Sequence, residues 1–259
     1  MNSLFLKIIA TLAYGIMIYV NFLANSLPIN GRATGVISDS YPNLFAPAGL
    51  TFAIWGVIYL LLLGYVVYQF APFKNGKNSK KDAWVKKVSG WFIATSVVNS
   101  VWIFAWHYDF IGLSVLIMLV FLVLLIRITD ILREVKLSTR ERLFISLPFS
   151  VYFGWITIAT IANITVFLVS VGWDGWGISD SIWTSIILVI GAVIGFLRMR
   201  KDKSVAYGLV FIWAYLGILL KHVSSTGFNG EHPGVIATVI GCLVFLGICV
   251  AWVGYKNRQ

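Results

Sequence analysis

The run FIGLSVLIMLVFLVLLI, residues 110–126, decides the fold class of this chain. It carries no charge, and about 20 mostly apolar residues in a helix are enough to cross the hydrocarbon core of a bilayer. Seven more apolar runs occur, and the predicted spans cover residues 4–23, 48–70, 88–106, 110–128, 143–169, 182–197, 205–220 and 235–255. The sequence therefore predicts an all-α integral membrane protein, a polytopic bundle of about eight transmembrane helices.

The composition agrees with this class. Of 259 residues, 59% are hydrophobic and 12% are charged, whereas soluble domains carry about 25% charged residues. The net charge of +10 could suggest a nucleic-acid partner. The basic residues, however, lie in short loops between apolar runs, so we expect the lipid bilayer as the partner and no nucleic acid.

The distribution of Lys and Arg predicts the orientation. Eight spans place 18 of the 20 basic residues on one side, and only Arg32 and Lys221 on the other. The positive-inside rule then places both termini in the cytoplasm, and we expect a cell (inner, cytoplasmic) membrane. The residues on the cytoplasmic side are Lys7, Lys74, Lys77, Lys80, Lys81, Lys86, Lys87, Arg127, Arg133, Lys136, Arg140, Arg142, Arg198, Arg200, Lys201, Lys203, Lys256 and Arg258.

An aromatic cluster opens the second predicted span, in FAPAGLTFAIWGVIY, residues 45–59. Trp55 and Tyr59 are four residues apart and therefore share one helix face. Phe52 precedes Trp55 by three residues, on the same side. Because Trp55 lies well inside the span, an interfacial tryptophan belt explains it poorly.

Two further spans combine amides with aromatic residues. The third contains Asn99 and Trp102, and the fifth contains Tyr152, Trp155 and Asn163. An amide inside a membrane needs a hydrogen-bonding partner. Two interpretations stay open for Asn99: an interhelical hydrogen bond that locks packing, or a polar contact to a bound ligand.

These three segments resemble the TspO family, the translocator proteins or tryptophan-rich sensory proteins. The matching positions are Pro47, Phe52, Trp55 and Tyr59 in the second span, Asn99 and Trp102 in the third, and Tyr152, Trp155 and Asn163 in the fifth. The resemblance covers residues 1–170, a TspO-like five-helix core, and leaves residues 171–259 as a three-helix transmembrane extension. Ala48 replaces a second proline of the family pattern, and Pro148 lies one turn earlier than usual.

The resemblance implies a membrane receptor with an apolar cavity below the first long loop. Its ligand would be flat and hydrophobic: a tetrapyrrole such as protoporphyrin or haem, or a sterol-like molecule. No cofactor is required, and a tetrapyrrole would be bound as ligand. Porphyrin photodegradation through Trp55 and Trp155 is implied by the resemblance alone. The implied ligand-binding residues are Phe52, Trp55, Tyr59, Asn99, Trp102, Tyr152, Trp155 and Asn163.

Other functions stay open. No charged residue lies in the middle of a predicted span, and this absence disfavours ion-coupled transport. Uncoupled transport of a small hydrophobic solute stays open, and so does a role as a membrane assembly partner. Acid–base catalysis is not expected among these aromatic residues. His107, His222 and His232 are dispersed along the sequence at span ends, so we expect no metal site. A homodimer is left open.

Overall fold

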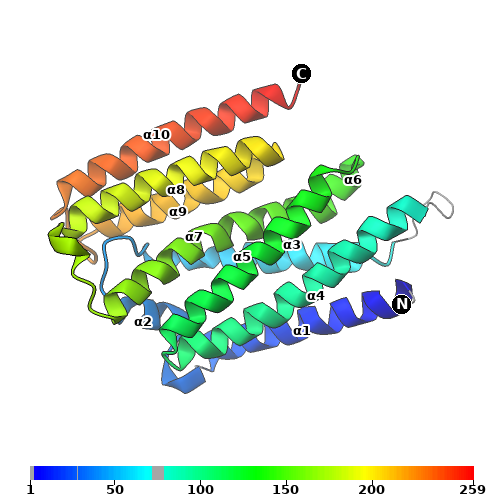
Figure 1. The fold of residues 1–259 in the computed structure, drawn as a ribbon, viewed down its shortest axis with the longest axis horizontal. Coiled ribbons are helices and arrows are strands. Elements are labelled where there is room, and N and C mark those ends of the chain that lie inside the picture. Colours follow the sequence, from blue (N-terminus) through cyan, green and yellow to red (C-terminus); the bar gives the residue numbers. More distant parts are fainter. Residues whose placement is uncertain (1–2, 28, 72–78) are drawn as a thin grey trace. The chain divides into compact units, whose positions relative to one another are not determined.

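The computed structural model describes residues 3–27, 29–71 and 79–259, and most of them are helical (Figure 1). Pro28, Lys74 and Lys77 lie outside the described residues. Within these described residues, eight helices are long and apolar enough to cross a membrane, which confirms the predicted fold class: Leu4–Ser26, Gly49–Tyr68, Ala83–His107, Ile111–Arg133, Thr139–Ser170, Asp180–Asp202, Val205–Val223 and Pro233–Lys256. The protein is a multi-pass membrane protein.

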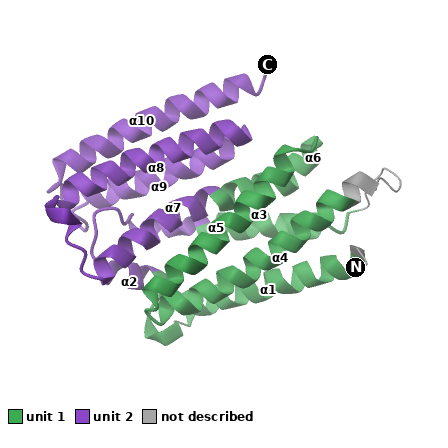
Figure 2. Ribbon diagram, viewed as in Figure 1, with its two compact units in different colours: residues 1–34, 55–153 green, residues 35–54, 154–259 purple. Residues whose placement is uncertain are grey.

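The chain forms two compact units (Figure 2). Unit 1 contains Met1–Thr34 and Trp55–Phe153, and unit 2 contains Gly35–Ile54 and Gly154–Gln259. The boundary falls inside helix α7 (Leu147–Ser170), whose first turns belong to unit 1. These two units are defined by contacts within each unit. The predicted boundary at residue 170 separates a family-like core from an extension, which is a different criterion, and that boundary stays a prediction.

Unit 1 is built from long helices in which α4 packs along both α1 and α5. Tyr65, Phe92 and Phe149 form an edge-to-face core, with ring centroids 4.9 to 5.8 Å apart. Edge-to-face pairs add to the stabilisation that burial of the rings provides. The elements are α1 (Ser3–Ser26), η1 (Ile29–Gly31), α3 (Ile54–Tyr68), α4 (Ser79–His107), α5 (Ile111–Arg133), α6 (Thr139–Glu141), the π-helical turn η3 (Arg142–Ser146) and the start of α7.

Unit 2 contains the last three long helices, in which α10 packs against both α8 and α9. A Cβ added at Gly191 would lie 2.7 Å from the Tyr215 hydroxyl, and one at Gly195 2.7 Å from the Phe211 ring. These two glycines, four residues apart on α8, let α9 approach α8 closely. The elements are α2 (Thr34–Asp39), η2 (Gly49–Ala53), the rest of α7, η4 (Gly175–Gly177), α8 (Asp180–Asp202), α9 (Val205–Val223) and α10 (Pro233–Lys256).

The second predicted span begins as the 3₁₀ turn η2 before it continues as α3. Helix α9 holds this turn. The Ala48 N–H donates to the Gly217 carbonyl at 3.0 Å, and Trp213 Nε1–H donates to the Thr51 carbonyl at 2.9 Å. A Cβ at Gly217 would lie 1.9 Å from Thr51 Oγ1, so only glycine permits this contact. The C-terminal helices therefore hold the segment that precedes Trp55.

Candidate functional site

A chain of buried polar side chains runs through unit 1. Asn21 Nδ2 donates to Asn99 Oδ1 at 2.6 Å and to the Met17 carbonyl at 2.9 Å. Asn99 Nδ2 donates to the Tyr152 hydroxyl at 3.1 Å, and that hydroxyl lies 3.8 Å from Met17 Sδ. Asn99 and Tyr152 are fully buried. Helices α1, α4 and α7 are thus joined by side-chain hydrogen bonds inside the membrane-spanning region.

Aromatic rings pack on Tyr152, at one end of this polar chain. Trp55 stacks on Tyr59, with centroids 5.5 Å apart and planes at 24°. Its ring also lies edge-to-face on Tyr152, at 6.1 Å, and Phe121 meets Tyr152 at 5.2 Å. The structure therefore brings together four of the predicted site residues in unit 1: Trp55, Tyr59, Asn99 and Tyr152.

The stacked Trp55–Tyr59 pair is held by a hydrogen bond from α1 and is partly exposed. Tyr14 Oη–H donates to the Tyr59 carbonyl at 2.9 Å. Trp55 and Tyr59 are only half-buried, in contrast to Asn99 and Tyr152. The cluster therefore offers aromatic surface next to satisfied, buried amide and hydroxyl groups.

The other four predicted site residues have their own contacts and burial. Trp102 is buried in α4 and stacks on Trp106 at 5.5 Å. In unit 2, Phe52 lies edge-to-face on Trp155 with centroids 5.9 Å apart, and Asn163 is buried in α7. Phe52 occupies η2 rather than α3, because the span begins as a 3₁₀ turn.

Asn21 is the polar residue that the sequence reasoning missed. The signal for it was present, since Asn21 is an amide inside the first predicted span, as Asn99 is in the third. The rule that an intramembrane amide needs a partner applies equally to both residues. Only the packing of α1 on α4 shows that they are each other's partners.

A family model described as TSPO-like protein matches residues 7–252. This match covers nearly the whole chain. The chain belongs to the TSPO-like family. Comparisons with curated proteins and with solved structures found no match. The matched region continues past residue 170 and includes α8, α9 and most of α10, so the family match is not confined to the first five spans.

In this TSPO-like protein, the end of α4 holds the start of the first long loop. His107 is fully buried, with Nδ1 3.1 Å from the Ile29 carbonyl and Nε2 3.0 Å from Thr34 Oγ1. Trp106 Nε1–H donates to the Thr34 carbonyl at 3.2 Å, and Arg32 forms an ion pair with Asp109. Both ring nitrogens of His107 are therefore occupied in holding the segment 29–34.

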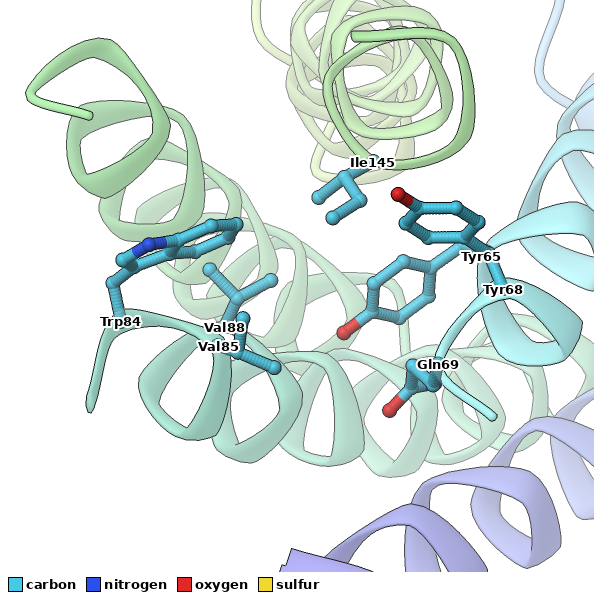
Figure 3. Close-up of a pocket in the computed structure, with 7 residues that line it drawn as sticks. All are labelled: Tyr65, Tyr68, Gln69, Trp84, Val85, Val88 and Ile145. Carbon is cyan, nitrogen blue, oxygen red and sulfur yellow. The ribbon is translucent and has the colours of Figure 1, made fainter. Parts of the chain in front are cut away.

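A separate cavity lies near the start of α4 (Figure 3). Trp84 stands on one side of it and Tyr65 and Tyr68 on the other. Its volume of about 10 Å³ is room for about one water molecule. This cavity of the TSPO-like protein is therefore too small for a drug-sized ligand. The full lining is Tyr65, Tyr68, Gln69, Trp84, Val85, Val88 and Ile145.

Proposed function

We propose that this protein is a membrane receptor that binds a flat hydrophobic ligand, a tetrapyrrole such as protoporphyrin or haem, at the aromatic cluster of unit 1. Membership of the TSPO-like family makes it a membrane binding protein of the TspO type. The tetrapyrrole would be a ligand rather than a required cofactor. A sterol-like molecule is the alternative ligand class.

One observation carries the proposal: half-buried aromatic rings lie directly against a buried amide and hydroxyl pair. The Trp55 ring touches both Tyr59 and Tyr152, and Tyr152 is hydrogen-bonded to Asn99. Ligand sites are mostly apolar and aromatic, with a few placed polar groups that orient the ligand. This cluster has both components within one membrane-spanning unit.

The stacked Trp55–Tyr59 pair favours a flat ligand. Its two rings are stacked with planes 24° apart, so a flat ligand would extend the stack by packing on an outer ring surface. Aromatic systems gain from offset stacking on such a surface beyond the area that they bury. Asn99 and Tyr152 now form a hydrogen bond with each other. On ligand binding, this bond would break, and both side chains would form hydrogen bonds with polar substituents of the ligand instead.

Titration with protoporphyrin tests the proposal. The purified protein in detergent is titrated while the porphyrin absorption band and tryptophan fluorescence are followed. We expect saturable binding that Trp55→Ala and Tyr152→Phe weaken by about tenfold, since a lost aromatic or hydrogen-bonding contact costs about 1 to 1.5 kcal/mol. Trp91→Ala is the matched control, because Trp91 lies on α4 with 38% of its surface exposed.

Three results separate the remaining interpretations. If porphyrin binds equally to the Trp55, Tyr152 and Trp91 variants, the unit 1 cluster is not the site. If illumination bleaches bound porphyrin in the parent protein, and Trp55→Phe or Trp155→Phe slows the loss, photodegradation is added to binding. If no porphyrin binds and a labelled hydrophobic solute crosses proteoliposomes faster than in empty liposomes, the protein is an uncoupled transporter.

A further inference from the structure

Two of the three histidines lie side by side in unit 2, although the sequence suggested that they are dispersed. His222 lies near the end of α9, and His232 is the residue just before α10. Their ring centroids are 5.8 Å apart, with planes at 79°. Phe228, from the loop between these helices, packs on both rings at 4.8 and 5.4 Å.

The hydrogen bonding of His222 leaves one ring nitrogen unused. The side chain is fully buried, and Nε2 lies 2.9 Å from the Leu44 carbonyl. A carbonyl oxygen only accepts, so Nε2 carries the proton and the neutral ring has its lone pair on Nδ1. Nδ1 is buried and has no hydrogen-bond partner among the described residues. A buried acceptor without a partner is costly, so it calls for an explanation.

His232 is arranged in the complementary way. Its Nδ1 lies 3.3 Å from Ser181 Oγ, at the start of α8. When Nδ1–H donates to this hydroxyl, the lone pair of His232 is on Nε2. Histidines that bind metals usually have this arrangement, in which one ring nitrogen donates to a protein oxygen and the other binds the ion. In that tautomer of His232, both members of the pair have an oriented ring and a nitrogen lone pair.

The separation of the rings fits a shared ion. A metal–nitrogen distance of about 2.0–2.1 Å places two imidazole centroids on one ion about 5 to 6.5 Å apart. The observed 5.8 Å lies in this range. We propose that Nδ1 of His222 and Nε2 of His232 bind one divalent transition metal of the copper, nickel or zinc class, which imidazole ligands suit.

Water would complete the coordination. No group of three or more His, Cys, Asp or Glu side chains that could hold a metal occurs in residues 3–27, 29–71 and 79–259. A site with two protein ligands binds less tightly than the three- or four-ligand sites of structural and catalytic zinc. The bound ion would join the end of α9 to the start of α10, across the loop at residues 224–232. This inference does not depend on the proposed tetrapyrrole function.

Copper titration of the full chain tests the site. The protein without a histidine tag is purified in detergent, freed of metal with a chelator, and titrated with Cu²⁺, which binds nitrogen ligands most strongly in the divalent series. Bound metal is measured by equilibrium dialysis, and its nitrogen ligands by electron paramagnetic resonance. We expect one equivalent with hyperfine coupling to two imidazole nitrogens.

Variants decide the assignment. His232→Ala should remove one coupled nitrogen and weaken binding at least tenfold, and Ser181→Ala should weaken it about tenfold. His107→Ala is the matched control, because both nitrogens of that buried histidine are already hydrogen-bonded, and it should leave the spectrum unchanged. His232 is only half-buried, so its variant avoids the folding risk of changing His222. Absence of stoichiometric binding, or an unchanged spectrum and affinity in His232→Ala, would overturn the proposal.

Discussion

The hydrogen bond between Asn21 and Asn99 can be measured as a coupling free energy. Asn99→Leu removes the 2.6 Å bond from Asn21 and the 3.1 Å bond to Tyr152. Interhelical side-chain hydrogen bonds in membranes contribute about 0.6 kcal/mol on average and up to about 1.7 kcal/mol. Removal of one partner also leaves buried groups unsatisfied, at about 1 to 3 kcal/mol. We therefore expect Asn99→Leu to lower the free energy of unfolding by about 2 kcal/mol.

A double-mutant cycle isolates the bond between the two amides. Asn21→Leu, Asn99→Leu and the double variant are unfolded with SDS in mixed micelles, and circular dichroism and tryptophan fluorescence are followed. Changes in helix propensity and apolar burial cancel in the cycle, so the interaction term reports the pair itself. We expect a coupling of about 1 kcal/mol, because Asn21 keeps its bond to the Met17 carbonyl when Asn99 is replaced.

The control cycle pairs Asn21 with Ser100. Ser100 is also on α4, but its hydroxyl donates to the Ser96 carbonyl of the same helix, at 3.0 Å. Asn21→Leu and Ser100→Ala should therefore be additive. A coupling below about 0.3 kcal/mol for Asn21 and Asn99, within the usual error of additivity, would refute the polar chain as a link between α1 and α4.

Three further predictions concern unit 2 and the topology. Gly217→Ala should lower the free energy of unfolding by about 1–3 kcal/mol through overpacking against Thr51. At Gly241, an added Cβ would have open space around it, so Gly241→Ala should be neutral or slightly stabilising in the same SDS assay. Trp213→Phe should cost about 1 kcal/mol through the lost bond to the Thr51 carbonyl. Trp91→Phe, at a similarly exposed position, should cost less, and equal losses would contradict a role for the indole N–H. A reporter fused after Gln259 should read cytoplasmic, because the positive-inside rule predicts both termini on that side. A signal from the opposite side would contradict the predicted orientation.

The sequence by itself determined the membrane class, the eight spans and part of the candidate site. Apolar runs of about 20 residues suffice for this, because a helix in lipid must satisfy its backbone hydrogen bonds within its own segment. The pairing of Trp55 with Tyr59 was equally predictable, because residues four apart on a helix are neighbours whatever surrounds them. The same local rule shows that Asn99 needs a partner, and it would have flagged Asn21.

Only the tertiary structure decided which distant residues meet. Asn21 and Asn99 are 78 residues apart, and Trp213 reaches the Thr51 carbonyl across 162 residues. No local spacing encodes such pairs, because they follow from how helices pack side by side. The same applies to His222 and His232, which the loop after α9 brings together. Because α9 holds the segment before Trp55, helices that carry no recognisable aromatic motif acquire a structural role that periodicity could not show.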